Sequence, residues 1–279
     1  MPEKTRLGAR TIRTLIVVAL LAVGVAALAL NWPFGTTKQG PLGGQPLPQL
    51  FPDSRLSLVD TLVAPAQARA HRDAERWLAA HPGRDDAAFA AFALNSVGDP
   101  PTGAAQQREL AELHRVDARR TPAGVTAANW LEAHGKKDVW KLYVKQYGQF
   151  AGKPAAKRAK RAFKATYRLA KNLAAQGKAR FARPAPYISD PSLHAINQAR
   201  FAKKFSYPAK HTLISFALAA LLTRYEGHRA PEYRWMADEI SYSRMYAGGH
   251  YPSDIAAGAY LGTLANDYEM HVPVRRSRR

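Results

Sequence analysis

The stretch Ser241-Tyr242-Ser243-Arg244-Met245-Tyr246-Ala247-Gly248-Gly249-His250-Tyr251-Pro252-Ser253-Asp254 places a fixed cation, an imidazole and a carboxylate close together in the chain. His250 follows Arg244 by six residues, and Asp254 follows His250 by four. An imidazole oriented by a carboxylate can act as a nucleophile or a base, and a guanidinium can bind an oxyanion. The stretch therefore contains the groups that phosphoryl transfer without a metal requires.

The spacing resembles the third signature of the type 2 phosphatidate phosphatase and vanadium haloperoxidase superfamily. That signature reads Ser-Arg, five residues, His, three residues, Asp, and Ser243, Arg244, His250 and Asp254 fill it. The resemblance implies phosphoryl transfer through a phosphohistidine, in which His250 attacks phosphorus and Asp254 holds its ring. It also implies that Arg244 and Ser243 bind the phosphate and that no metal or other cofactor takes part.

The second signature of the family, Pro-Ser-Gly-His, has a partial match in Pro208-Ala209-Lys210-His211. Proline and histidine are kept, whereas Ala209 and Lys210 replace serine and glycine. The resemblance implies that His211 protonates the leaving alkoxide and later activates water. Lys210 either adds a cation at the phosphate or blocks the site.

The first signature, Lys, six residues, Arg-Pro, is also partial. Counted from Lys178, its proline falls on Pro186 and its arginine on Ala185; counted back from Arg183-Pro184, its lysine falls on Gln176. The register from Lys178 is the better match, and it leaves the usual phosphate-binding arginine missing. Arg183 lies two residues away, on the same side of an extended segment, so we expect Arg183 and Lys178 to bind the phosphate.

The net charge of +20 indicates an anionic partner, which the chemistry limits to nucleic acid, a phospholipid surface or a phosphate ester. No zinc-finger, RNP or helix-turn-helix pattern accompanies the charge, so we expect no nucleic-acid binding. The tract Lys153–Arg161 is typical of a solvated helix face, with a membrane surface as the alternative contact. Cysteine is absent, which excludes a thiol nucleophile, a Cys-ligated zinc and disulfides.

Four cations, Lys4, Arg6, Arg10 and Arg13, precede an uncharged apolar run over residues 14–30. A run of this length can cross a bilayer, and the basic flank keeps the amino terminus cytoplasmic. The rest of the chain is then exported to the periplasmic, or extracytoplasmic, side as a membrane-anchored domain. The alternative is a signal peptide cleaved after Ala27-Leu28-Ala29.

The composition predicts four parts: a basic flank and anchor over 1–31, a linker rich in Pro and Gly over 32–60, a helical domain over 61–272, and a basic tail over 273–279. Helical periodicity predicts helices over 66–80, 87–96, 106–119, 130–150, 154–176, 211–225, 233–242 and 252–268, with an Asp85-Asp86 cap on the second. The predicted fold class is all-α. It is a helical bundle of the acid phosphatase and haloperoxidase type, preceded by one transmembrane helix.

Two predicted helix starts bear on the chemistry. Pro208 lies just ahead of His211, and Pro252 suits the first turn of the final helix. His250 then lies just before that helix, with Asp254 in its first turn. Because helix amino ends favour anions, we expect both histidines to face one phosphate.

These observations together predict an exported, membrane-tethered phosphatase that hydrolyses phosphomonoesters or lipid phosphates. A single spanning segment favours the bacterial acid phosphatase-like branch over integral lipid phosphatases. The alternatives are a weakened member that binds phosphate or anionic surfaces without turnover, because of Ala185, Ala209 and Lys210, and, further off, vanadate-dependent halide oxidation or a basic nucleic-acid-binding module. The sequence leaves the oligomeric state open.

Overall fold

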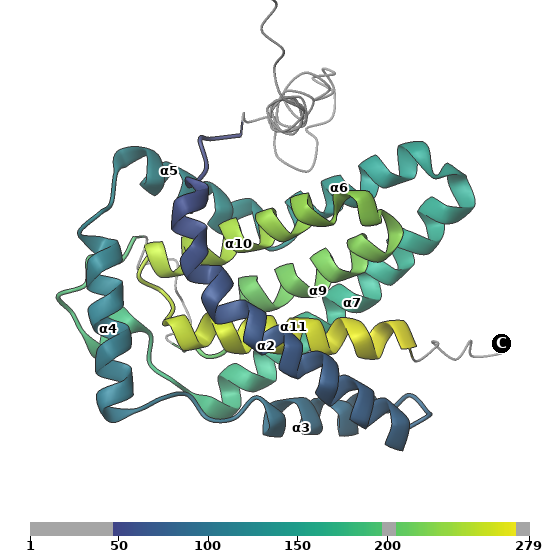
Figure 1. Ribbon diagram of the computed structural model, residues 1–279, viewed down its shortest axis with the longest axis horizontal. Coiled ribbons are helices and arrows are strands. Elements are labelled where there is room, and N and C mark those ends of the chain that lie inside the picture. Colours follow the sequence, from purple (N-terminus) through teal and green to yellow (C-terminus); the bar gives the residue numbers. More distant parts are fainter. Residues whose placement is uncertain (1–46, 197–204, 272–279) are drawn as a thin grey trace, which may run out of the picture. The chain divides into compact units, whose positions relative to one another are not determined.

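The computed structural model describes residues 47–196 and 205–271 (Figure 1). The predicted anchor over 1–31, most of the linker and the tail over 273–279 lie outside the described residues. Within the described ranges, no helix is both long enough and apolar enough to cross a bilayer.

The described chain is helical, as predicted. Its elements are α2 (Asp53–Ala80), α3 (Asp86–Ser96), α4 (Gly103–Asp117), α5 (Pro122–His134), α6 (Asp138–Phe150), α7 (Gly152–Phe181), α8 (Pro186–Ser189), α9 (Lys210–Tyr225), the 3-10 turn η2 (Gly227–Arg229), α10 (Ala230–Tyr246) and α11 (Pro252–His271). In this part of the chain no β-strand forms, and a single β-bridge joins Pro184 to Phe205.

Helices α9, α10 and α11 make up the centre of the fold. α9 packs against α7, α10 and α11, and α2 crosses α10 and α11 (Figure 1). The segment of α9 from His211 to Ala219 is buried throughout, and α11 is buried over most of its length. Both helices are thus core helices, and the polar side chains of α11, among them Asp254 and Glu269, are buried with it.

Two glycines let α9 and α11 approach backbone to backbone. A Cβ atom added at Gly262 would lie 2.3 Å from the carbonyl oxygen of Leu213, and one at Gly258 would lie 2.8 Å from that of Ala209. No side chain fits in that space, so glycine is required at both positions. The close approach sets the distance between the start of α9, which carries His211, and the start of α11.

The helix predicted over 130–150 is instead two helices, α5 and α6. The chain turns at residues 135–137, where the Trp140 indole N–H donates to the carbonyl oxygen of Gly135 at 2.8 Å. Asp138 then provides the acidic first turn that favours a new helix start. Because of this turn, α5 and α6 can each present a different face to the core.

Two other helices, α2 and α10, have bounds that differ from the prediction. α2 begins at Asp53, so its first turns occupy the end of the predicted linker over 32–60, and Pro65 lies inside it. α10 continues to Tyr246 and so carries Arg244 in its last turn. The cap of α3 is as predicted, since the Asp85 carboxylate accepts from two backbone N–H groups at 3.1 and 2.9 Å.

Candidate active site

A tight turn between α10 and α11 brings Arg244 and His250 to the same region. Gly248 has a φ of 73°, a left-handed conformation that favours glycine, and its N–H donates to the carbonyl oxygen of Met245 at 2.8 Å. α11 then begins at Pro252, as predicted, so Asp254 lies in its first turn. The local sequence thus sets the relative positions of the cation, the imidazole and the carboxylate.

His250 and Asp254 form a buried pair. Nδ1 of His250 lies 3.4 Å from Oδ2 of Asp254, and the same oxygen accepts the backbone N–H of Tyr251 at 2.9 Å. Nδ1 is thus the ring nitrogen of His250 that faces Asp254. Burial, together with the nearby positive charges of Lys178 and Arg244, lowers the pKa of His250 to about 4 although Asp254 opposes the shift. The imidazole is therefore neutral at neutral pH, a form that can act as a nucleophile.

His211 is the second residue of α9, as predicted, and it is buried. Burial lowers its pKa well below the ordinary value, and the positive charges of Lys136, of His250 when it is protonated, of Lys210 and of Lys178 lower it further. Interactions between charges weaken with distance, so a cation that shifts the pKa of a histidine lies close to it. Lys178 affects both His211 and His250, and the two histidines therefore share one electropositive region. The structure thus brings together His211, His250, Lys178 and Lys210, which the sequence predicted as site residues.

Arg244 is almost completely buried, at 1% exposure. Its Nε and Nη2 donate to the Ser243 hydroxyl at 3.1 and 3.0 Å, and Nη2 also donates to the carbonyl oxygen of Ala128 at 3.2 Å. The Ser243 hydroxyl in turn donates to the carbonyl oxygen of Ile240 at 2.6 Å. Ser243 was predicted to bind phosphate; in the structure its hydroxyl orients Arg244. Burial lowers the pKa of Arg244 to about 9, so the guanidinium keeps its charge at neutral pH.

Lys178 lies near the carboxyl end of α7 and points to the segment that precedes α9. Its Nζ donates to the carbonyl oxygens of Phe205 and Ser206, the latter at 3.1 Å. Burial lowers its pKa to about 8; the negative charge of Asp254 opposes this shift, and the positive charge of Lys210 adds to it. Lys178 therefore lies near both the His–Asp pair and the start of α9. An anion bound between these two elements would contact it.

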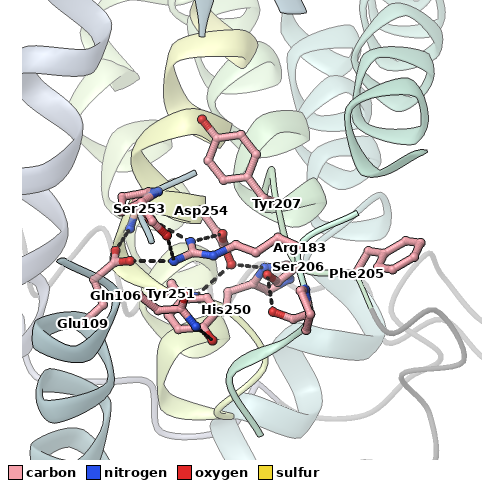
Figure 2. A network of polar contacts seen from close by, with 12 residues as sticks. Gln106, Glu109, Arg183, Phe205, Ser206, Tyr207, His250, Tyr251, Ser253 and Asp254 are labelled. Atoms are coloured by element: carbon pink, nitrogen blue, oxygen red, sulfur yellow. Dashed lines mark hydrogen bonds and ion pairs between the residues drawn. The ribbon is translucent and has the colours of Figure 1, made fainter. Parts of the chain in front are cut away.

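Arg183 forms the centre of a polar network that includes Asp254 (Figure 2). Its Nη1 donates to Oδ1 of Asp254 and to the hydroxyl of Ser253, both at 2.8 Å, and its Nη2 donates to Glu109 at 2.7 Å. The guanidinium also stacks on the Tyr251 ring at 3.7 Å. The sequence predicted that Arg183 reaches the phosphate, whereas the structure places both terminal nitrogens on carboxylates. Arg183 thus holds Asp254, the residue that holds His250.

Asp254 remains ionised because of these contacts. Burial by itself raises the pKa of a carboxyl group, but the hydrogen bond and charge of His250 and the charge of Arg183 bring the pKa of Asp254 below its ordinary value. An ionised Asp254 favours the tautomer of His250 that carries its proton on Nδ1, which lies 3.4 Å from Oδ2 of Asp254. Arg183 and His250, on the two sides of Asp254, both keep it ionised.

Sequence reasoning missed two charged residues of this region, Glu132 and Lys136. The Glu132 carboxylate forms an ion pair with Arg244, and its Oε1 lies 3.9 Å from Nε2 of His211. The backbone carbonyl oxygen of Glu132 accepts from Nε2 of His211 at 3.3 Å. Both residues precede the first signature, so no motif marked them. In residues 47–196 and 205–271, no three His, Asp or Glu side chains are arranged to hold a metal ion.

Comparison with known proteins agrees with the motifs. The family model described as PAP2 superfamily matches residues 165–277, which include all three signatures. Residues 165–277 therefore match the type 2 phosphatase (PAP2) superfamily, in agreement with the resemblance.

Three relatives can be named. The chain is 37% identical over 62 residues to the bacitracin transport permease protein BcrC of Bacillus licheniformis, covering 22% of this chain and 30% of the relative. It is 30% identical over 92 residues to a non-specific acid phosphatase of Salmonella typhi, covering 32% and 37%. A solved transmembrane PAP2 type phosphatidylglycerolphosphate phosphatase from Bacillus subtilis is 16% identical, covering 64% of this chain and 89% of that one, with a TM-score of 0.45. The matched segments thus span about a third of the curated relatives' length.

Proposed function

We propose that this protein is a phosphatase that hydrolyses phosphomonoesters or lipid phosphates through a phosphohistidine intermediate. The observation that carries the proposal is a neutral, buried His250, held by an ionised Asp254 beside Arg244, Lys178 and His211. The match to non-specific acid phosphatases supports the same reaction class.

In the first step, Nε2 of His250 attacks phosphorus and the bond from phosphorus to the leaving oxygen breaks. Asp254 stabilises the positive charge that develops on the ring. His211 donates a proton to the leaving alkoxide. A bound phosphate dianion brings negative charge to a pocket of cations and raises the pKa of His211, so substrate binding itself favours the protonated acid.

In the second step, neutral His211 removes a proton from water, and the hydroxide attacks the phosphohistidine. The bond between phosphorus and Nε2 breaks, which restores His250 and releases inorganic phosphate. Arg244 and Lys178 bind the equatorial oxygens of the transferring group. Loss of one such preorganised donor typically costs about 2.7 to 4 kcal/mol of transition-state stabilisation.

The proposal includes attachment to a membrane. The apolar run over 14–30 with its basic flank supports an anchor that leaves the phosphatase domain on the extracytoplasmic side. Lipid phosphates would then be reachable as well as soluble esters.

The test uses the full chain with an aryl phosphate. We expect His250→Ala to lower turnover at least about a thousandfold, because the nucleophile is lost. His228→Ala is the matched control, since His228 is exposed on η2, and it should keep the wild-type rate. His211→Ala quenched in alkaline detergent, where the phosphorus–nitrogen bond of a phosphohistidine survives, should retain labelled phosphate on the protein. Equal rates for wild type and His250→Ala would remove the enzyme hypothesis.

A second candidate is a weakened member that binds phosphate without turnover. Two contacts favour it: Glu132 occupies Arg244, and carboxylates occupy Arg183. This protein would bind orthovanadate in a titration but show no hydrolysis above the His250→Ala background. Both the phosphatase and the weakened member would bind the anion, and only the phosphatase would show turnover.

A further inference from the structure

Helix α7 carries a row of exposed cations that the proposed site does not use. Lys153, Lys157, Lys160, Lys164, Arg168 and Lys171 follow one another at intervals of three or four residues, and all six are exposed. This spacing places them on one face of the helix. With a rise of 1.5 Å per residue, the row is about 27 Å long. We call these six residues the basic stripe.

The charge of the basic stripe is not neutralised within the described residues. The 30-residue helix contains no Asp or Glu, and none of the six cations forms an ion pair with a described carboxylate. The opposite face of α7, with Ala159, Phe163 and Leu173, is buried, and the helix packs on α9 and α11. The stripe is therefore a fixed, unneutralised row of positive charge on a rigid element.

An exposed aromatic residue stands at the end of this row. Phe150 is the last residue of α6, and its 85% exposure is the highest among the large exposed apolar side chains of the described chain. Gly152, with a φ of 78°, reverses the chain so that α7 begins two residues later (Figure 1). Phe150 thus lies at the tip of the α6–α7 hairpin, next to Lys153.

We propose that this tip and the basic stripe dock on an anionic lipid surface. A flat layer of negative headgroups can meet six cations along a straight helix, and Phe150 can enter the boundary between headgroups and acyl chains. Nucleic acid offers the same phosphate charge but no apolar phase for an aromatic tip. The same helix carries Lys178 near its other end, so docking would hold the candidate active site close to the lipid surface.

The absence of cysteine allows a local test on the full chain. Gln149→Cys introduces a single labelling site at the exposed tip, to which an environment-sensitive fluorophore is attached. The probes are vesicles of phosphatidylcholine alone and vesicles of phosphatidylcholine mixed with phosphatidylglycerol. Because the fluorophore reports only on the tip, insertion of the apolar run over 14–30 does not mimic the signal.

We expect a blue shift with the anionic vesicles only, which decreases as salt is added. Each cation near such a surface contributes about fivefold in partition, so Lys157→Gln, Lys160→Gln and Lys164→Gln together should weaken docking roughly 150-fold. The matched control, Arg72→Gln with Arg108→Gln and Arg119→Gln, removes three exposed cations elsewhere and should leave the shift nearly intact.

Three results would overturn the proposal. They are an equal shift with neutral vesicles, an equal loss in the matched control, and a shift with duplex DNA but not with vesicles. Helicity measured by circular dichroism shows that each variant is folded. Hydrolysis of a soluble aryl phosphate is measured in parallel, so failure of docking and failure of the proposed phosphatase activity are seen separately.

Discussion

Replacing Glu132 by Gln should tighten anion binding and loosen the fold at the same time. The Glu132 carboxylate is paired with Arg244, the buried guanidinium proposed to bind phosphate. A phosphate must displace this carboxylate before it can contact Arg244. Glu132→Gln keeps the shape of the side chain and removes its charge, so the competition weakens.

The magnitude follows from the pair itself. A hydrogen bond to a charged group contributes about 1.5–3 kcal/mol, so release of Arg244 should tighten orthovanadate binding by roughly 10-fold to 150-fold. Removing one partner of a buried ion pair typically costs about 3–5 kcal/mol of stability. The Glu132 side chain is 23% exposed, and solvent screening therefore puts the expected loss at or below the lower end of that range.

The assay is calorimetric titration with orthovanadate, combined with melting curves with and without the anion. Without the anion, Glu132→Gln should melt at a lower temperature than wild type. Orthovanadate should then raise the melting temperature of Glu132→Gln by more than it raises that of wild type. Glu269→Gln is the matched control: it removes the partner of Arg84, at 2.7 Å, about 22 Å along α11 from Asp254. It should lower the melting temperature without changing the affinity for orthovanadate. Unchanged or weaker anion binding by Glu132→Gln would refute the reasoning.

Three further predictions concern stability and the His–Asp pair. Gly262→Ala should destabilise the protein by about 1–3 kcal/mol in denaturant unfolding, because its Cβ meets the backbone of α9, whereas Gly227→Ala, with open space around its Cβ, should not. Burial raises the pKa of Glu239 from 4.5 to about 8, so the folded state holds a proton that the unfolded state loses, and stability should fall as pH rises from about 4.5 to 8. Glu239→Gln should flatten the melting temperature across that range, and an unchanged slope would contradict this account. Arg183→Gln should abolish turnover and also lower the free energy of unfolding, because it leaves Asp254 buried without its cation. If this variant is as stable as wild type, the contact is dispensable.

The parts of the site that could be predicted from sequence are those fixed by local chain geometry. The positions of His250 and Asp254 around the start of α11 follow from Pro252 and the turn before it. The start of α9 at Lys210 follows likewise from the proline ahead of it. Short spacings within one turn of helix leave few alternatives, so both predictions agree with the structure.

The contacts of Arg183 could not be predicted in this way. Alternation along an extended segment gave the side to which Arg183 points but not the groups that it meets there. Its partners, Glu109 and Asp254, are 74 and 71 residues away in sequence, and the packing of α4 and α11 brings them together. Buried carboxylates pair strongly with a guanidinium, and this outweighed the expected contact to phosphate.

The break between α5 and α6 also could not be predicted from local sequence. Periodicity over 130–150 fits one helix, and no proline or strong turn pair interrupts it. The turn is instead stabilised by the Trp140 indole hydrogen bond and by packing on the core. Glu132 lies on α5 and Lys136 lies in this turn, and both precede the first signature, so no motif marked either residue.

The network around Arg183 also determines when, in the life of the polypeptide, the His–Asp pair can form. One guanidinium is shared among the carbonyl of Pro101, the carboxylate of Glu109 and the carboxylate of Asp254. A nascent chain that has not yet emerged from the ribosome as far as residue 254 lacks the last of these partners. Until that residue arrives and the distant segments close around the arginine, the imidazole has no oriented companion, so the His–Asp pair exists only in a chain that is almost fully synthesised and folded.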